Sequence, residues 1–215
     1  MIIAVAHQKG GVGKSTIVWN LAIHISQKHN VEIVDIDIQK TLTYTNELRK
    51  SQTNLRPMII KNFDNAEDFK AYIENDNDDK ISFIDLGGFD SAMNRLALIT
   101  ADMIITPVSH KNFELLGLKN FETVLEELST VIKSELVVKI LLNNIPAQKT
   151  KLDTLKEYID KSAHFDLLDT VLHSRADYDK SAGVGQNVIE YRPKEKAAKE
   201  ILDLSEEIIK ILNTH

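Results

Sequence analysis

The feature that most constrains this chain is a glycine-rich loop that directly follows its first apolar run. Residues 2–6 (IIAVA) have the composition of a buried strand, and residues 8–16 continue as QKGGVGKST. Glycines allow the backbone to curl so that several N–H groups point at one anion, and a helix that begins near Lys14 adds the positive end of its dipole. The order of strand, glycine-rich loop and helix therefore predicts a phosphate-binding loop.

The residues of this loop have separate expected roles. The Lys14 ammonium can reach the β- and γ-phosphates of a nucleotide, and the Ser15 hydroxyl can bind Mg²⁺. A further lysine, Lys9, opens the loop, where an ordinary phosphate-binding loop needs none. The predicted nucleotide-binding residues of the loop are Gly10, Gly11, Val12, Gly13, Lys14, Ser15 and Thr16.

Residues 9–16 (KGGVGKST) resemble the deviant Walker A motif of the ParA/MinD family of ATPases. The resemblance implies that the ligands are ATP or ADP with Mg²⁺, and that ATP is hydrolysed slowly to ADP and phosphate. It also implies a homodimer in the ATP state, in which Lys9 of each chain contacts nucleotide phosphates across the dimer. Lys9 and Lys14 are therefore the first two candidate catalytic residues.

Composition places the chain among ordinary soluble globular proteins. It has 215 residues, of which 43% are hydrophobic and 27% are charged. It contains no cysteine, which excludes disulfides, cysteine-ligated zinc and iron–sulfur clusters. No signal peptide is recognisable, and no apolar stretch approaches the roughly 18 residues that span a bilayer. We therefore expect a cytoplasmic protein.

Strand-like and helix-like segments alternate along the chain. The expected strands cover 1–6, 31–36, 57–60, 81–86, 102–108 and 136–142, and the expected helices lie near 14–28, 41–51, 64–74, 91–100, 112–132 and 148–161. Strands separated by helices of this length pair in parallel. The expected fold is a doubly wound, mostly parallel α/β sheet flanked by helices, as in P-loop NTPases, with residues 1–215 forming a single domain.

Two aspartates lie at the end of the second expected strand. Asp35 and Asp37 lie on the same side of an extended chain because side chains alternate along a strand. Two carboxylates beside a phosphate loop suit Mg²⁺ coordination and the positioning of water, although a solvated turn also produces this pattern. The stretch resembles the family's Asp-x-Asp-Pro-Gln motif, with Ile38 where proline is usual. That resemblance implies that Asp37 orients or activates the attacking water and that Asp35 supports the metal site.

A third aspartate, Asp85, ends the apolar strand expected at 81–86 and is followed by Gly87 and Gly88. This stretch resembles a Walker B strand, whose aspartate holds Mg²⁺ directly or through water. The two glycines permit a mobile backbone near the γ-phosphate, so we expect the segment to distinguish ATP from ADP. The alternative is a buried strand that ends in an aspartate-initiated turn.

Two positions late in the chain are candidates for contact with the adenine and ribose. Relatives in the family often place an asparagine after the strand that corresponds to 136–142, and an amide can pair with an adenine edge. We favour Asn143 over Asn144, with a plain turn as the alternative. Residues 188–193 (VIEYRP) resemble the segment that packs along the base, and Pro193 is the predicted contact there. Alternatively, Pro193 only starts the last helix.

Among members of the family, the resemblance is greatest to short ParA-type partition ATPases without an N-terminal DNA-binding domain. MinD-type members end in a basic amphipathic helix that lies on membrane. The helix expected here at 197–212 is acidic, and its apolar positions suit docking on the core, so we expect no membrane partner. The resemblance implies that the ATP dimer holds nucleoid DNA without sequence preference and segregates a plasmid or chromosome, and that a ParB-like centromere-binding protein stimulates hydrolysis.

DNA binding by this chain requires a local basic patch, because its formal net charge is -6. Phosphate contacts need Lys or Arg on one face of the dimer. The first candidates are Arg175 and Arg192, although ordinary solvating charges would look the same. Further candidates are Lys149, Lys151, Lys180, Lys194 and Lys196.

Two other classes of function fit the same motifs. One is an ATP-dependent adaptor that positions a protein cargo and binds no DNA. The other is a P-loop kinase or synthetase that acts on a small molecule. Lys9 argues against the latter, because a kinase that works as a monomer has no evident use for the additional lysine.

Overall fold

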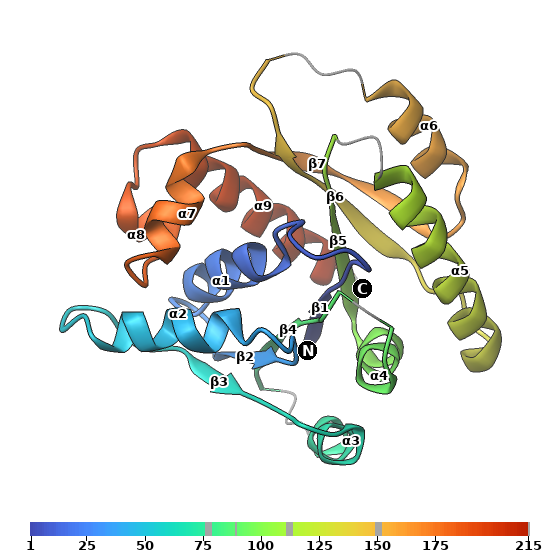
Figure 1. The fold of residues 1–215 in the computed structure, drawn as a ribbon, viewed down its shortest axis with the longest axis horizontal. Coiled ribbons are helices and arrows are strands. Elements are labelled where there is room, and N and C mark those ends of the chain that lie inside the picture. The colour runs from blue at the N-terminus through green and yellow to red at the C-terminus, as the bar shows by residue number, and fades with distance from the viewer. Residues whose placement is uncertain (76–78, 89, 111–113, 149–151, 215) are drawn as a thin grey trace.

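The computed structural model describes residues 1–75, 79–88, 90–110, 114–148 and 152–214 (Figure 1). In this part of the chain one sheet has the strand order β3-β2-β4-β1-β5-β6-β7, and each neighbouring pair runs parallel. Strand β1 therefore lies at the centre, between β4 and β5. The strands are β1 (Ile2–Val5), β2 (Val31–Asp35), β3 (Ile59–Lys61), β4 (Ile81–Asp85), β5 (Met103–Val108), β6 (Val138–Ile145) and β7 (Phe165–His173).

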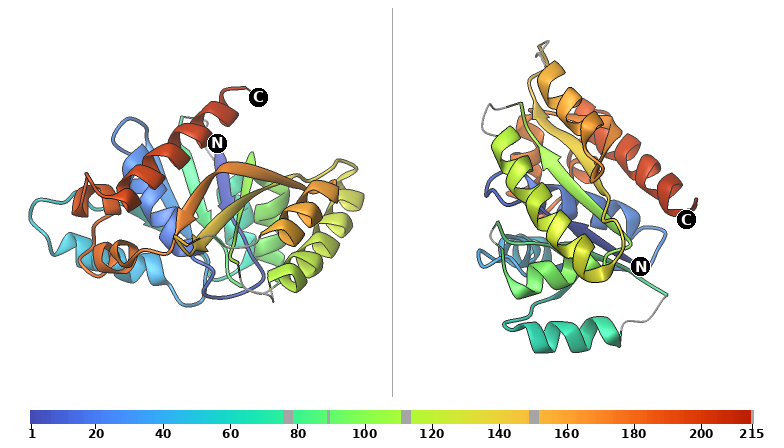
Figure 2. Two further views of the ribbon diagram at one scale, coloured as in Figure 1. Left: turned by 90° about the horizontal axis from the view of Figure 1, so that it is seen from above. Right: turned by 90° about the vertical axis from the view of Figure 1, so that its right-hand side faces the viewer.

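Helices cover both faces of this sheet, so that it forms the middle of three layers (Figure 2). The layers follow from the alternation of side chains along β1: Ile3 and Val5 pack against one set of helices, and Ile2 and Ala4 against the other. The first set is α1 (Lys14–Ile25), α2 (Thr41–Lys50), α7 (Ala176–Ala182), α8 (Val188–Tyr191) and α9 (Lys196–Leu212). The second is α3 (Ala66–Glu74), α4 (Ala92–Thr100), α5 (Glu114–Ile132) and α6 (Asp153–Lys161).

The predicted doubly wound α/β fold is confirmed, and most of the predicted elements match those observed within a few residues. Strand β7 was not predicted. Its pairing with β6 changes register twice, between Ile140 and Leu142 and again before Ile145, so the apolar residues of this edge strand do not alternate regularly. Residues 112–113 and 149–151, where two predicted helices begin and where Lys149 and Lys151 stand, lie outside the described residues.

The C-terminal helix α9 docks on the sheet, as its apolar pattern predicts. Ile201, Leu204 and Ile208 are fully buried, and the helix lies against β7 and α1. The buried apolar stripe accounts for the amphipathic sequence of this helix. Within the described ranges, no helix is long and apolar enough to cross a membrane.

Candidate functional site

The glycine-rich loop joins the carboxyl end of β1 to α1 at the centre of the sheet, where parallel α/β sheets bind their ligands. Two of its glycines are required by backbone geometry. Gly11 has a φ of 74° and Gly13, the residue before α1, a φ of 96°, a region that L-residues with a Cβ rarely adopt. A Cβ on Gly13 would also lie 2.5 Å from the Asn143 side-chain nitrogen.

The two lysines of the loop lie close together. The Lys14 ammonium lies 3.5 Å from the Lys9 backbone oxygen, and only 5% of Lys14 is exposed. Burial lowers the pKa of Lys14, whereas the charges of Asp85 and Asp37 raise it. Lys14, in the first turn of α1, is thus a buried cation. Its counter-charges come from the predicted acidic residues Asp37 and Asp85.

Asp35 and Asp85 end neighbouring strands and are register partners across β2 and β4. Both are fully buried. The amide and the hydroxyl of Thr43, in the first turn of α2, donate to the same Asp35 carboxylate oxygen at 3.1 and 3.0 Å. Burial raises the pKa of Asp35 more than these Thr43 bonds lower it. Thr43 was not anticipated, and it fixes this carboxylate to α2.

Burial also raises the pKa of Asp85, to about 7, while the Ser15 hydroxyl lowers it and the Asp35 charge adds to the increase. Neither Asp85 carboxylate oxygen has a hydrogen-bond partner of regular geometry in the described part of the chain, and one oxygen of Asp35 has none either. Buried acceptor oxygens of this kind favour a cation.

The oxygen atoms of Ser15, Asp35 and Asp85 suit Mg²⁺ that is also bound by water and phosphate. They are too few to form a metal site from protein ligands alone. Among the described residues no cluster of three or more His, Cys, Asp or Glu side chains is placed to hold a metal ion. Mg²⁺ is commonly bound by one or two carboxylates and a hydroxyl, with water and phosphate oxygens completing its shell. Ser15, Asp35 and Asp85 supply such a partial set at the end of the phosphate loop.

The raised pKa of Asp85 predicts a pH-dependent stability without ligand. Because folding favours the protonated carboxyl, the folded state loses stability as pH rises from about 4 to about 7, by up to about 4 kcal/mol for a shift of about 3 pKa units. The side chain of Asp85→Asn does not titrate. The free energy of unfolding of this variant should therefore rise relative to that of the unaltered protein across this pH window, and the difference should stay constant above it. Urea unfolding of both proteins in EDTA at pH 5 and pH 8 measures this difference in unfolding free energy. An equal difference at both values would contradict the assignment.

The segment after β2 forms a tight turn although it lacks the expected proline. The Gln39 amide donates to the Asp37 carboxylate at 2.9 Å, and the Lys40 amide donates to the Asp37 backbone oxygen at 3.0 Å. Lys40 has a φ of 49°, and its ammonium donates to the backbone oxygen of Asp35 at 2.8 Å. Ile38 is 74% exposed, so the position where proline is usual projects outward.

The glycines after β4 lie directly against the phosphate loop. A Cβ on Gly88 would lie 3.1 Å from the Gly10 amide nitrogen and 3.3 Å from the Lys9 carbonyl carbon. Further along, Asn94 donates to the Gly87 backbone oxygen at 3.1 Å. A side chain at position 88 would fit only if these backbone atoms moved by a few tenths of an ångström. The segment after β4 thus lies against the phosphate loop.

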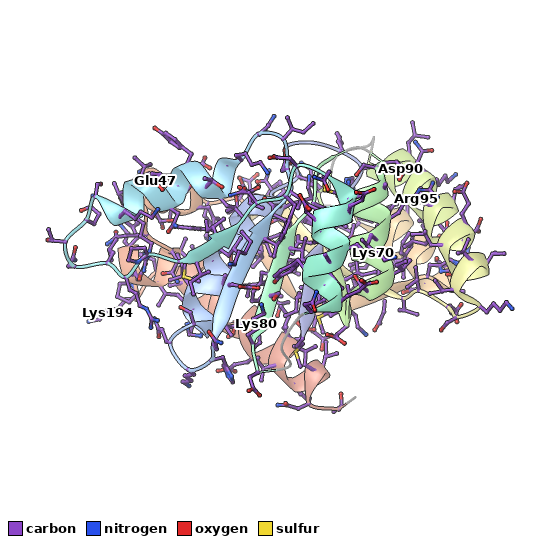
Figure 3. The ribbon with its side chains drawn as sticks, turned by 90° about the horizontal axis from the view of Figure 1, so that it is seen from below. Glu47, Lys70, Lys80, Asp90, Arg95 and Lys194 are labelled. Carbon is purple, nitrogen blue, oxygen red and sulfur yellow. The ribbon has the colours of Figure 1, made fainter. Side chains whose placement is uncertain are left out.

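Arg95 of helix α4 binds Asp90, which lies shortly after these glycines. The Arg95 guanidinium donates to Asp90 at 2.7 Å and to Glu127 of α5 at 2.9 Å, and Figure 3 shows the Asp90 and Arg95 side chains directed toward one another. These groups are partly exposed, so the pairs contribute little to stability. Their geometry links the segment after β4 to two helices.

A cavity of about 420 Å³ adjoins the phosphate loop on the side of β6 and β7, large enough for a nucleoside. The Asn143 amide, at its edge, donates to the Val12 backbone oxygen at 2.7 Å. Asn143 and Asn144 belong to β6 rather than to a turn beyond it, and Asn144 has a φ of 56° at the register change. Other lining residues include Gly13, Thr16, His173, Arg175 and Tyr178.

The far wall of this cavity is held by Glu200 of α9, which sequence reasoning did not find. The Arg175 guanidinium donates to Glu200 at 2.6 Å, and the His173 ring lies 2.9 Å from the same carboxylate oxygen. Burial raises the pKa of Glu200, but the hydrogen bonds from Arg175 and His173 together outweigh it, so the pKa of this carboxyl is lowered. If the sequence had shown β7, His173 and Arg175 would have been candidates for this wall. Ligands of parallel α/β sheets bind outside the carboxyl ends of the strands, and both residues lie at that end of β7.

Pro193, the predicted base contact, and Arg192, a predicted DNA contact, are not among the residues that line this cavity. Pro193 lies in the turn between α8 and α9, which begins only at Lys196, so it does not start the last helix either. The Arg192 side chain is 52% exposed and lies 3.6 Å from Asp177. The structure therefore separates Arg192 and Pro193 from the cavity and places Arg175 in its wall.

Comparisons with known proteins agree with this geometry. The CobQ/CobB/MinD/ParA nucleotide binding domain matches residues 3–188. A putative plasmid partition protein from Borrelia burgdorferi B31 bound to AMPPNP is 16% identical, with a TM-score of 0.69 over 97% of this chain and 98% of that one. An McdA variant from Cyanothece in complex with ATP is 14% identical, with a TM-score of 0.75 over 96% and 95%. MinD in the Aquifex aeolicus MinC:MinD cell division complex is a further match.

The match to the Aquifex aeolicus MinC:MinD complex is 14% identical, with a TM-score of 0.72 over 97% of this chain and 95% of the other. At these identities the solved structures establish the fold alone. The family match covers most of the chain and includes the phosphate loop, the three aspartates, and His173 and Arg175 of the cavity wall, but it ends before Glu200. It also confirms the resemblance that the two lysines of the loop indicate. This chain is a member of the CobQ/CobB/MinD/ParA nucleotide-binding family.

Proposed function

We propose that residues 1–215 form one ATPase domain that dimerises when it binds ATP and separates after hydrolysis. The observation that carries this proposal is the phosphate loop itself, in which buried Lys14 lies within reach of the charges of Asp85 and Asp37 while Lys9 precedes the glycines. ATP with Mg²⁺ is the proposed ligand, and solved relatives with AMPPNP or ATP bound support it.

The proposed mechanism assigns one task to each residue. The loop amides and Lys14 stabilise negative charge on the β- and γ-phosphates. Asp37 orients the attacking water and accepts its proton. Ser15, Asp85 and Asp35 would hold Mg²⁺, which supplies further neutralisation of phosphate charge. Lys9 reaches the phosphates of the partner subunit, so the complete site exists only in the dimer and hydrolysis is slow in the monomer.

The proposed biological role is that of a ParA-type partition ATPase. Its ATP dimer binds DNA without sequence preference, which places it at the nucleoid, and a ParB-like partner stimulates hydrolysis and release. The plasmid partition protein among the solved relatives supports this role. Arg192, half exposed near the end of α8, is the better placed of the two predicted DNA contacts, because Arg175 is occupied by Glu200.

One observation favours a second candidate, an adaptor that positions a protein cargo and binds no DNA. The two arginines predicted to contact DNA each lie beside a carboxylate, Glu200 for Arg175 and Asp177 for Arg192, and the formal net charge is -6. MinD in complex with MinC, among the solved relatives, has a protein partner. ATP-dependent dimerisation without DNA binding would favour this candidate.

Lys9→Ala tests the dimer mechanism. The variant should bind ADP with the affinity of the unaltered protein, because Lys14 and the loop amides remain. It should fail to self-associate with ATP, and its hydrolysis should fall to the monomer rate. Sedimentation with Mg-ATP and with Mg-ADP measures the first effect. Lys70→Ala, which removes an exposed lysine of α3 (Figure 3), is the matched control. A normal ATP dimer of Lys9→Ala would refute the role across the interface.

Glu200→Gln tests the assignment of the cavity to the nucleoside. Loss of the carboxylate charge releases Arg175 and His173 from the wall, so ATP should bind about 3- to 10-fold more weakly, the range expected for one or two hydrogen bonds. Inorganic triphosphate, which lacks the nucleoside, should bind unchanged in a calorimetric titration. Glu207→Gln is the control, because Glu207 lies on the same helix but accepts from the amides of Asp169 and Thr170. An equal loss for triphosphate would contradict the assignment.

A further inference from the structure

His7 occupies a buried position directly before the phosphate loop. It follows Ala6, whose amide donates to the Ile105 backbone oxygen at 3.0 Å, and only 2% of His7 is exposed. Its imidazole Nδ1 lies 2.9 Å from the backbone nitrogen of Lys9. Because a backbone N–H can only donate, Nδ1 is the acceptor, and the imidazole is the neutral form with its proton on Nε2.

Helix α5 packs against this ring. A Cβ on Gly117 would lie 3.3 Å from His7 Cε1, so the glycine in the helix interior leaves the space that the ring occupies. A glycine at such a position costs about 1 kcal/mol relative to alanine. The adjoining cavity has a volume of about 20 Å³, too small for the imidazole to turn into. Packing therefore holds His7 with its acceptor directed at Lys9.

Two other contacts lie beside this stretch of backbone. The Gln8 side chain donates to the Asn120 backbone oxygen of α5 at 3.4 Å, and Gly88 lies against the Lys9 carbonyl carbon. The backbone of Lys9 is thus held by His7 on one side and approached by the segment after β4 on the other. A fixed backbone reduces the conformational entropy that the long Lys9 side chain must lose when it engages a ligand.

We propose that His7 is a positioning residue for Lys9, and that its hydrogen bond to the Lys9 amide presets the loop for reaching the partner subunit's nucleotide. The inference rests on the proposed role of Lys9 in the ATP dimer. It assigns to His7 an effect on self-association and none on nucleotide binding by the monomer. Loss of the bond should weaken self-association about fivefold for each loop, and about 25-fold for a dimer that contains two.

Three substitutions in the full chain separate the acceptor from the shape of the ring. Each is combined with Asp37→Ala so that ATP is not consumed. In His7→Asn the side-chain oxygen can stand where Nδ1 stands, whereas His7→Leu has no acceptor and His7→Gln places its acceptor one bond further along. Thermal unfolding identifies any variant that fails to fold, and the Gln variant then replaces the Leu variant.

The measurements are the Kd for Mg-ADP by calorimetry and self-association with Mg-ATP by sedimentation. We expect the Leu and Gln variants to bind ADP within about twofold of the Asp37→Ala parent and to dimerise about 25-fold more weakly. The Asn variant should dimerise like the parent. A parent that does not dimerise with ATP would overturn the proposed function and this inference with it. A parent dimer that is indifferent to Leu and Gln would overturn the inference alone. An Asn variant as weak as Leu, or a loss of ADP binding, would do so too.

Discussion

Lys14→Ala should abolish useful nucleotide binding, with the Kd for ATP and for ADP raised about 100-fold or more. The expectation rests on charge: hydrogen bonds to charged groups are worth about 1.5–3 kcal/mol each, and in the proposed mechanism Lys14 makes them to two phosphates. Its low exposure and its lowered pKa show that the protein holds this cation at a cost in burial. The charges of Asp85 and Asp37 offset part of that cost, and a bound anion would offset more. Calorimetric titration with Mg-ADP measures the change.

Lys70→Ala again serves as the surface control, because its exposed side chain makes one pair within α3. Lys14→Arg adds a second comparison: it keeps the charge but brings a larger, planar head into a closely packed first turn. An unchanged Kd for Lys14→Ala would show that the glycine-rich loop is not the phosphate site. It would remove the foundation of the proposed mechanism.

Asp37→Ala should bind ATP and dimerise normally but hydrolyse ATP about 10²- to 10⁴-fold more slowly, the range expected for the loss of a positioned base. Asp37 stands beyond the end of β2, near enough to Lys14 and Asp85 for its charge to act on both. Phosphate release with saturating Mg-ATP, measured above the dimerisation concentration, gives the rate.

A second substitution separates this chemistry from the turn that Asp37 supports. The Asp37 carboxylate accepts from the Gln39 amide, and Asp37→Asn retains an oxygen for that bond while removing the charge. If Asp37 acts on water, the Asn and Ala variants should be equally slow. If the Asn variant hydrolyses ATP at the normal rate, the residue serves only the turn and another group must position the water.

The phosphate loop could be predicted because its information is local. Strand β1, the glycines and the start of α1 are contiguous, and each glycine that needs a positive φ is visible as a glycine. The layers of the fold were predictable for a related reason, since apolar runs that alternate with helical periods leave few alternatives to a parallel sheet. Family membership followed from one additional residue, Lys9, whose position an ordinary phosphate loop does not explain.

The rest of the site depends on contacts that sequence spacing does not encode. Asp35 and Asp85 meet because β2 and β4 are neighbours in register, which no local pattern reveals. The cavity wall joins the end of β7 to Glu200 of α9, and β7 was missed because its register shifts break the alternation. His7 carried no motif at all. Its role emerges only from the bond to the Lys9 amide and the space above Gly117.

In the proposed function, ATP creates a dimer that holds DNA. The most direct test is binding of Asp37→Ala to random-sequence duplex DNA with Mg-ATP and with Mg-ADP across a salt series, with sedimentation to confirm the dimer. We predict binding with ATP only, weakening steeply as salt rises because phosphate contacts release counterions. A confirmed ATP dimer that binds no DNA in either nucleotide state at low salt would contradict the partition role and leave the protein-cargo adaptor as the function.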